Sequence, residues 1–167
     1  MALLKLINGK CSLVDDDLID ELSLFNWRIL DWKGYVVRTD RIHGKWTTIL
    51  LSRQIMGFPL CLQVDHINGD KLDNRRCNLR MVTNRQNQMN RKPRRCSRTG
   101  LKGVTYASGK YLARIVADNV RIRIGLYATA EEAAIAYDKK ALECYGEYAR
   151  TNFLKRGLVS DRQMRLL

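Results

Sequence analysis

Short apolar runs broken by turn residues fill the first sixty positions, and this pattern predicts small strands. Asn8-Gly9 lies between two such runs, as in a two-residue hairpin turn. Lys33-Gly34 and His43-Gly44 separate three further strand-like runs in WRILDWKGYVVRTDRIHGKWTTILL. We therefore expect residues 1–60 to form a small unit built largely of hairpins.

Two short helices are expected within this unit. The aspartates at 15–17 can cap a helix running through Leu18 and Leu22 to Phe25, and they place negative charge where the helix dipole favours it. The segment SRQIMGFP predicts a second helix, closed by Gly57 and Pro59. His43 reads as an ordinary turn residue.

Residues 61–91 show a strand, a polar loop, a second strand and a helix. Leu62-Gln63-Val64 predicts a strand that delivers Asp65 and His66, and Asn78 to Val82 predicts its partner. Thr83 can cap a helix through Asn87 to Met89. About thirty residues bury little core, so we expect residues 1–60 to brace this segment.

Three strands and a helix are predicted after residue 100. GVTYA, YLARIVA and VRIRIGLY are separated by turn signals at Gly109 and Asp118-Asn119. Thr129 and Glu132 form a T-x-x-E capping box before a helix that ends at Gly146. Strict alternation in VRIRIG puts its two arginines on one face of the sheet and its isoleucines on the other.

The pattern as a whole predicts an α+β fold with two modules. Residues 1–91 form the first, made of the bracing unit 1–60 and the motif 61–91. Residues 92–100 form a basic linker, because KPRRCSRTG has no apolar periodicity. Residues 101–155 form the second module, and 156–167 a C-terminal tail.

Charge makes nucleic acid the expected partner. The net charge of the 167-residue chain is +13, made of −2 over residues 1–40, +10 over 41–100 and +5 over 101–167. A basic field of this strength attracts a polyanion and releases its counterions. A membrane surface is the weaker alternative, because no basic amphipathic helix is evident. No apolar run approaches the roughly 18 residues of a membrane span, and no signal peptide is read, so we expect a cytoplasmic protein.

The cysteines do not form a metal motif. All five are far apart and no CxxC pair occurs among them: Cys11, Cys61, Cys77, Cys96 and Cys144. Structural zinc sites need closely spaced pairs of ligands. No structural zinc is therefore expected.

Asp65, His66 and Asn87 carry the candidate chemistry. The carboxylate of Asp65 and the amide oxygen of Asn87 are hard donors that suit Mg²⁺ or Mn²⁺. A neutral His66 imidazole can accept a proton from water. Because neighbours in a strand point to opposite faces, Asp65 and His66 can share a site if the backbone turns between them. Together these groups predict a phosphodiester hydrolysis site.

This segment resembles the HNH, or ββα-metal, nuclease motif, and the chain resembles HNH homing endonucleases of phages and mobile introns. Asp65 and His66 match, with Asn78 twelve residues after the histidine and Asn87 nine further on. The resemblance implies that His66 is the general base, Asp65 and Asn87 hold one Mg²⁺ or Mn²⁺, and Asn78 ties the loop. It also implies 5′-phosphate and 3′-hydroxyl products. Ser52 stands where relatives often have histidine.

The segment from Gly100 to Phe153 resembles the AP2 DNA-binding domain. The matching features are the GV strand start, the IGLY strand end, TAEEAAIAYD and the closing Ala149-x-x-Asn152-Phe153. The resemblance implies a three-stranded sheet that enters the major groove, with a helix behind it. The DNA contacts that it implies are Lys102, Thr105, Arg114, Arg121 and Arg123. The family usually has arginine, an acid and tryptophan where this chain has Thr105, Arg114 and Arg123, so the plant target sequence does not transfer.

We therefore expect a site-recognising DNA endonuclease, acting on double-stranded DNA in a bacterial host cell and held at the nucleoid by DNA. A monomer is expected and a dimer remains open, as does nicking against double-strand cleavage. Further arginines are expected to contact the phosphate backbone: Arg80, Arg85, Arg91, Arg94, Arg95 and Arg98. The alternatives are an AP2-type DNA-binding regulator with an inactive nuclease fold, and an RNA-binding or RNA-processing protein.

Overall fold

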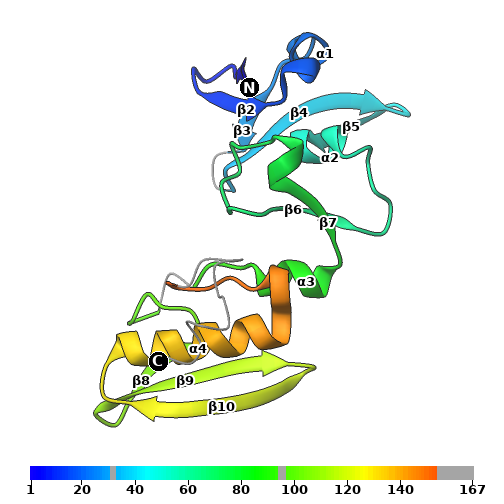
Figure 1. Ribbon diagram of the computed structural model, residues 1–167. Helices are drawn as coiled ribbons and strands as arrows, with labels where there is room; N and C mark the ends of the chain where they lie inside the picture. The colour runs from blue at the N-terminus through cyan, green and yellow to red at the C-terminus, as the bar shows by residue number, and fades with distance from the viewer. Residues whose placement is uncertain (31–32, 94–96, 154–167) are drawn as a thin grey trace. The chain divides into compact units, whose positions relative to one another are not determined.

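The computed structural model describes residues 1–30, 33–93 and 97–153. It divides the chain into two compact units, Met1–Arg85 and Gln86–Leu167 (Figure 1). Both combine small antiparallel sheets with few helices, which confirms the α+β fold class. The predicted contacts Arg94 and Arg95 and the tail 156–167 lie outside the described residues.

Two sheets form the body of the N-terminal unit. In the first, β1 and β2 pair as a hairpin in which Lys5 lies opposite Cys11, and Gly9 supplies the left-handed conformation that the turn requires (φ 77°). The second has the order β3-β4-β5, with His43 and Gly44 in the connecting turn. All these predicted hairpins are confirmed. The strands are β1 (Ala2–Lys5), β2 (Cys11–Val14), β3 (Arg28–Leu30), β4 (Tyr35–Ile42) and β5 (Lys45–Leu50).

Trp27 lies at the centre of this unit's core. It is almost fully buried among aliphatic side chains that include Leu4, Leu22 and Leu51. Its indole Nε1 donates to the backbone oxygen of Leu22 at 2.8 Å, so the ring is buried without an unsatisfied donor. The apolar alternation of β1, β2 and β4 thus closes over one shared core.

The first helix is shorter than the sequence predicted. A 3-10 turn at Asp16–Leu18 leads into α1 (Ile19–Ser23), which ends before Phe25. Asp15 makes no capping hydrogen bond within this helix. Its carboxylate instead accepts from the backbone N–H of Arg76 at 2.8 Å, so a tertiary contact has replaced the expected local one. The second predicted helix is confirmed as α2 (Leu51–Ile55).

The motif segment forms a two-stranded hairpin followed by a helix. Strand β6 (Gln63–His66) pairs with β7 (Leu79–Val82), with His66 opposite Leu79. Helix α3 (Asn84–Met89) follows, and the division between the two units falls inside it. Strand, loop, strand and helix are as predicted, except that Asn78 lies in a 3-10 turn (Arg76–Asn78) ahead of β7.

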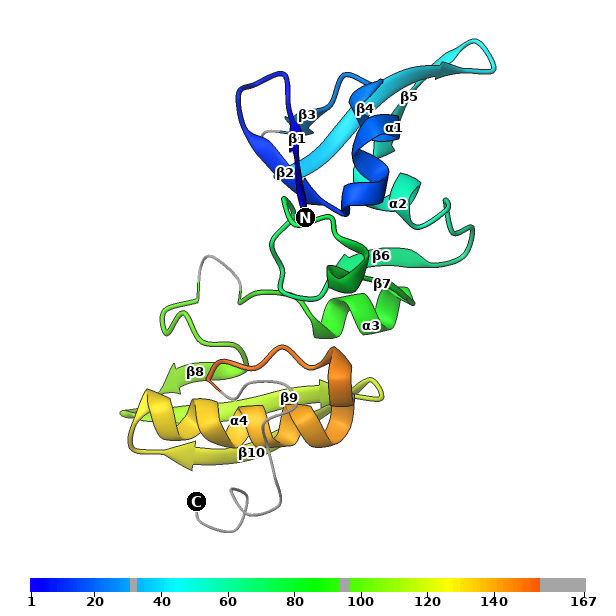
Figure 2. The same ribbon diagram turned by 45° about the horizontal axis from the view of Figure 1, so that its top comes forward.

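The C-terminal unit is an antiparallel sheet of order β10-β9-β8 covered on one face by α4 (Figures 1 and 2). Thr129 and Glu132 form the predicted capping box at the start of α4. Asp118 and Asn119 have positive φ, as the turn between β9 and β10 requires. The elements are β8 (Val104–Ala107), β9 (Lys110–Ala117), β10 (Val120–Tyr127), α4 (Ala130–Tyr145) and a 3-10 turn (Gly146–Tyr148).

Small residues let α4 approach the sheet closely. Ala133, Ala134 and Ala141 are completely buried, and Tyr137 packs over Gly103. A Cβ on Gly103 would lie 1.9 Å from the Tyr137 ring, and φ there is +76°, so this position needs glycine on two grounds. Within the described ranges, no helix has the length and apolar character that crossing a membrane demands.

Candidate active site

His66 is the last residue of β6, and its side chain is buried, with 4% of its surface exposed. Its Nε2 lies 3.1 Å from Oδ1 of Asn74 in the loop that follows. Burial lowers the pKa of the imidazole, while the Asn74 hydrogen bond and the charge of Asp65 act in the opposite direction. The net shift is downward, which favours the neutral ring that a general base requires.

Asp65 lies opposite Arg80 across the hairpin. Its carboxylate Oδ2 accepts from Nη2 of Arg80 at 2.9 Å and from Nε at 3.1 Å, and both side chains are largely buried. The strand runs through Asp65 and His66 without a break, and the reversal comes after them, where the Gly69 N–H donates to the His66 oxygen at 2.9 Å. The backbone therefore does not turn between Asp65 and His66 as expected, although the Asp65 charge still acts on the imidazole.

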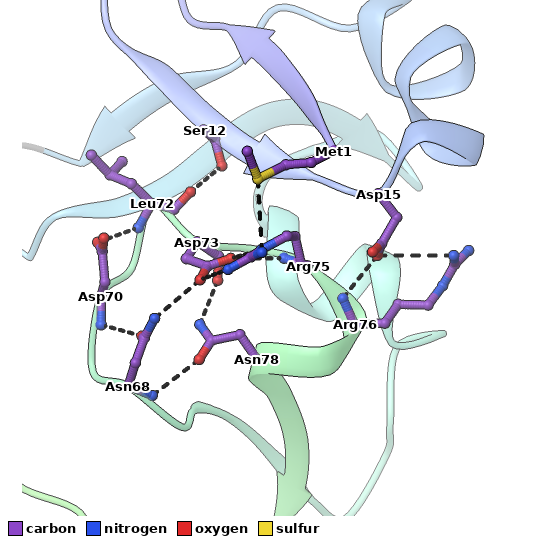
Figure 3. Close-up of polar contacts among 10 residues, drawn as sticks. All are labelled: Met1, Ser12, Asp15, Asn68, Asp70, Leu72, Asp73, Arg75, Arg76 and Asn78. Carbon is purple, nitrogen blue, oxygen red and sulfur yellow. Dashed lines mark hydrogen bonds and ion pairs between the residues drawn. The ribbon is translucent and has the colours of Figure 1, made fainter.

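Asn78 ties the loop to itself (Figure 3). Its Oδ1 accepts from the backbone N–H of Asn68 at 3.0 Å, and its Nδ2 donates to the backbone oxygen of Asp73 at 2.7 Å. The two bonds connect Asn78 with earlier residues of the same loop, and they use both the oxygen and the NH₂ group of its side-chain amide. Both bonds are made to the loop, so Asn78 influences His66 through the loop backbone.

Asp73 is the second buried carboxylate of the loop. Nε and Nη2 of Arg75 each donate to one of its oxygens at 2.7 Å, and Asn68 Nδ2 donates at 3.0 Å (Figure 3). The hydrogen bonds from Arg75 lower the pKa of this carboxyl despite its burial. A bidentate pair of this kind holds the loop in one conformation.

The N-terminal hairpin braces the loop directly, as the sequence predicted. The Leu13 N–H donates to the Leu72 oxygen at 2.8 Å, and the Asn74 N–H donates to the Leu13 oxygen at 2.8 Å. This short parallel bridge extends β2 onto the loop. Arg76 adds an ion pair to Asp17 at 2.7 Å, so backbone and side chains both hold the loop against residues 12–17.

Asn74 is the residue that sequence reasoning missed. It is 1% exposed and makes the hydrogen bond to His66 described above. In the sequence it stands in DNRR, which has the composition of an ordinary polar turn. No local signal distinguishes it, because its partners are reached through the fold.

Asn87 lies in a different unit from the other candidate site residues. Asn87 is half-buried on α3, past the division at Arg85 and Gln86, so the structure groups Asp65, His66 and Asn78 in one unit and Asn87 in the other. Across residues 1–30, 33–93 and 97–153, no cluster of three or more His, Cys, Asp or Glu side chains could hold a metal ion. The residues predicted to hold the ion, Asp65 and Asn87, supply one carboxylate and one amide oxygen, a hard donor set that suits a cation keeping much of its water.

The predicted phosphate contacts are differently placed. Arg85, Arg91 and Arg98 are exposed, whereas Arg80 is largely buried against Asp65. Lys102 is half-buried and its ammonium donates to the backbone oxygen of Met89 within the C-terminal unit. Arg80 and Lys102 would each have to leave a partner in order to reach DNA.

The outer face of the C-terminal sheet is basic, as predicted from its alternation. Arg114 and Arg123 lie directly opposite each other on β9 and β10, and Arg121 lies two residues from Arg123 on the same face; all three are exposed. Ile122 and Ile124 pack toward α4 instead. Thr105 on β8 is half-buried. Like charges directly opposite in a sheet repel, so this face favours an anionic partner.

Comparison with known proteins follows the same division of the chain. The family model described as HNH endonuclease matches residues 57–89, which span β6, β7 and α3. An uncharacterized HNH endonuclease of Acanthamoeba polyphaga mimivirus is 32% identical over 149 residues, covering 86% of this chain and 75% of the viral protein. No solved structure matches the chain.

Two plant proteins match over short segments. An ethylene-responsive transcription factor of Medicago truncatula is 51% identical over 49 residues, which are 28% of this chain and 21% of that protein. A dehydration-responsive element-binding protein of Arabidopsis thaliana is 58% identical over 33 residues, 20% of this chain and 14% of that protein. The motif with its buried histidine and the long match to the viral protein together show that the chain belongs to the HNH endonuclease family.

Proposed function

We propose that this protein is a site-recognising DNA endonuclease of the homing type, in which His66 is the general base. The observation that carries the proposal is the buried His66 imidazole, which is held by Asn74 and on which the charge of Asp65 acts. Family membership supports nuclease activity, and the net charge of +13 supports a polyanionic substrate.

The reaction needs one proton acceptor at the attacking water. A water oxygen forms a bond to phosphorus while one of its protons moves to His66. The bond from phosphorus to the 3′ oxygen breaks, and that oxygen takes up a proton from solvent. The products are a 5′-phosphate and a 3′-hydroxyl. Lowering of the His66 pKa by burial keeps the ring neutral, and therefore ready to accept the proton, near neutral pH.

We expect a single divalent cation, Mg²⁺ or Mn²⁺, to bind at Asp65. The ion would compete with Arg80 for the carboxylate, and Asn87 would add an amide oxygen from α3. When bound, the ion would neutralise charge on the phosphate and on the departing oxygen. Asn78 would hold the loop, and with it His66, in position through its bonds to Asn68 and Asp73.

Target recognition is assigned to the C-terminal module. Its three-stranded sheet, its single covering helix and its exposed Arg114, Arg121 and Arg123 support an AP2-like DNA-binding domain, and the short plant matches point the same way. Arginine can contact guanine in the major groove or a phosphate. The exposed arginines at 85, 91 and 98 would follow the backbone between the two modules.

Cleavage of plasmid and phage DNA by the full chain with Mg²⁺ tests the proposal. We expect cleavage by the wild type, a loss of at least about a hundredfold for His66→Ala, and 5′-phosphate ends on sequencing. Open circles that precede linear plasmid would indicate nicking by a monomer, and direct linearisation a dimer. No cleavage by the wild type, or equal cleavage by His66→Ala, would contradict the catalytic role.

The alternative is a DNA-binding regulator of AP2 type with an inactive nuclease fold, which the short plant matches favour. It predicts tight, sequence-dependent binding without cleavage under any divalent metal. A binding assay on the same DNA pool, run in EDTA and then in Mn²⁺, separates the two. Tighter binding of duplex DNA than of RNA in that assay would also argue against an RNA substrate.

A further inference from the structure

We infer that Asn74, supported by Ser12 of the N-terminal hairpin, holds His66 in the tautomer that carries its hydrogen on Nε2. This inference rests on the proposed role of His66 as base and adds a positioning residue to it. A neutral imidazole has one nitrogen that donates and one that accepts. Which nitrogen bears the hydrogen decides which one can take a proton from water.

The orientation of the Asn74 amide follows from its other partners. Its Nδ2 lies 3.0 Å from the backbone oxygen of Lys71 and 2.9 Å from Oγ of Ser12. A backbone oxygen can only accept, so the amide must present its NH₂ group to Lys71. The carbonyl Oδ1 therefore faces His66, and Nε2 must be the donor in their 3.1 Å contact.

Ser12 fixes the direction of its own hydrogen bond with Asn74. Its hydroxyl donates to the backbone oxygen of Leu72 at 2.8 Å (Figure 3), so its oxygen is left to accept from Asn74. Two backbone oxygens, those of Lys71 and Leu72, thus end the chain of hydrogen bonds. A backbone oxygen can only accept a hydrogen bond, so the direction of every hydrogen bond in this network is fixed.

The three side chains of this network are buried, so water cannot easily replace their hydrogen bonds. Ser12 is 0% exposed, Asn74 is 1% exposed and His66 is 4% exposed. Leaving a buried hydrogen-bonding group without a partner is unfavourable, so the alternative tautomer, which would aim a lone pair at Oδ1, is disfavoured. His66 is left with Nδ1 as its basic nitrogen.

The network also gives the N-terminal hairpin a part in catalysis. Ser12 is on β2, far outside the matched family segment at 57–89, and it is 62 positions from Asn74 in sequence. The backbone hydrogen bonds between Leu13 and the loop hold β2 and the loop in register for this contact. Residues 1–60 therefore do more than brace the motif, because they help set the chemical form of the base.

Nitrogen-15 NMR of the imidazole tests the inference without any need for cleavage. The chain has two histidines, so a His43→Gln background leaves His66 as the one ring observed. We expect the neutral ring to show a protonated Nε2 and a bare Nδ1. Asn74→Asp keeps an acceptor and should preserve this pattern, whereas Asn74→Ala should yield a mixture of tautomers. A wild-type ring protonated on Nδ1, or an unchanged tautomer in Asn74→Ala, would overturn the inference.

Two comparisons separate positioning from loss of fold. Asp73→Asn damages the same loop but leaves the Asn74 contact, so it should lower stability without changing the tautomer. In cleavage assays, Asn74→Ala should lower kcat by roughly ten- to hundredfold with KM little changed, as for other residues that orient a reacting histidine. Asn74→Asp should recover part of that loss. A change in KM with kcat unaltered would contradict the positioning role.

A failure of the proposed function gives a different result. If His66→Ala cleaves as well as the wild type, the base is assigned wrongly, yet the NMR pattern of His66 still tests the network. If His66→Ala abolishes cleavage while Asn74→Ala keeps both the tautomer and kcat, the base stands and the inference about Asn74 falls.

Discussion

Two buried carboxylates in the β6–β7 segment are each held by an arginine, and their surroundings give them different uses. Asp73 is enclosed by Arg75 and Asn68 within the loop, so it serves the loop's shape. Asp65 meets Arg80 across the hairpin and directly precedes His66 on β6. Replacing one partner of a buried pair leaves the other charge uncompensated, so the two pairs can be told apart by mutation.

Arg80→Gln should strengthen divalent metal binding. Arg80 and a cation compete for the Asp65 carboxylate. Removing the arginine leaves this buried carboxylate without its charge partner, so Mn²⁺ binding should tighten roughly fivefold or more. The measurement is calorimetric titration of the DNA-free protein with Mn²⁺, supported by the rise in Tm that the metal causes.

Arg76→Gln is the matched control for that experiment. It removes an equal charge from the same segment, but its ion pairs are with Asp15 and Asp17. It should leave Mn²⁺ affinity unchanged, and Asp65→Asn should abolish binding. Weaker Mn²⁺ binding in Arg80→Gln would mean that Arg80 supports the metal site instead of competing for it.

Asp73→Asn should destabilise the protein in a pH-dependent way. The folded-state pKa of Asp73 is lowered by Arg75, so the ionised form contributes stability above the unfolded pKa of about 3.9. We expect a loss of about 1–3 kcal/mol at pH 7. As the pH falls through the lowered folded pKa the wild type loses the same contribution, so the two proteins should converge. Urea unfolding at pH 7, 5 and 3 measures this, and a difference independent of pH would contradict it.

At the scale of elements, tight turns and close packing set the C-terminal module. Ser108 and Gly109 make the turn between β8 and β9 with φ of 50° and 80°. Gly103 has a different role, because its missing Cβ makes room for the Tyr137 ring from α4. Asp138, fully buried on the same helix, accepts from the backbone N–H groups of Asn152 and Phe153 at 2.7 Å and so secures the segment after α4.

Gly103→Ala should therefore damage this module far more than Gly109→Ala. Both positions have positive φ, which costs about 1 kcal/mol for alanine. At Gly109 nothing lies within 4 Å of the new Cβ, whereas at Gly103 the Tyr137 ring must move. We expect about 1 kcal/mol for Gly109→Ala and about 3 kcal/mol or more for Gly103→Ala.

The tryptophans allow this loss to be assigned to one unit. Trp27, Trp32 and Trp46 all precede residue 86, so tryptophan fluorescence follows the N-terminal unit. Gly103→Ala should shift the unfolding seen by far-UV circular dichroism and leave the fluorescence transition in place. A joint shift of both transitions would show that the two units unfold together.

At the scale of the whole molecule, the proposed function assigns cleavage to the N-terminal unit and target binding to the C-terminal unit. The N-terminal unit contains the buried polar network around His66, and the C-terminal unit presents a face with three exposed arginines. By unit, the net charge is +3 over residues 1–85 (13 Lys and Arg against 10 Asp and Glu) and +10 over residues 86–167 (17 against 7). We therefore expect the C-terminal unit to supply most of the electrostatic attraction to DNA.

Replacement of Arg114, Arg121 and Arg123 by alanine should weaken DNA binding with little effect on kcat at saturating DNA. For each arginine that contacts a phosphate, the slope of log K against log salt should become shallower by about 0.9. Filter binding at several salt concentrations measures the slope. An unchanged slope with affinity lost for the target alone would assign these arginines to the bases.

Lys139→Ala and Lys140→Ala together form the control for that triple variant. Both lysines are on α4, which covers the opposite face of the sheet. They remove positive charge from the C-terminal unit but none from the basic face. An equal loss of binding and of salt slope per charge removed would show a general effect of net charge, and the basic face would lose its special role.

Local patterns determined most of the elements before any tertiary contact was considered. Asn8-Gly9, His43-Gly44 and Asp118-Asn119 specify hairpins because few residues adopt positive φ at low cost. Alternation in VRIRIG assigned the arginines of β10 to the face away from α4. The spacing of Asp65, His66, Asn78 and Asn87 identified the resemblance to the motif. These signals succeed because turn chemistry and strand periodicity act over a few neighbouring residues.

The tertiary structure decided what each polar side chain does. The sequence predicts that Asp15 caps a helix, yet its carboxylate accepts from the backbone N–H of Arg76, 61 positions away. Asn74 looks like a turn residue until Ser12 and Lys71 orient its amide toward His66. A hydrogen-bond partner is chosen by distance, direction and burial once the chain has folded. By itself the sequence determined the hairpins, the alternation and the family motif, whereas the partners of Asn74, Asp15 and Asp65 required the fold.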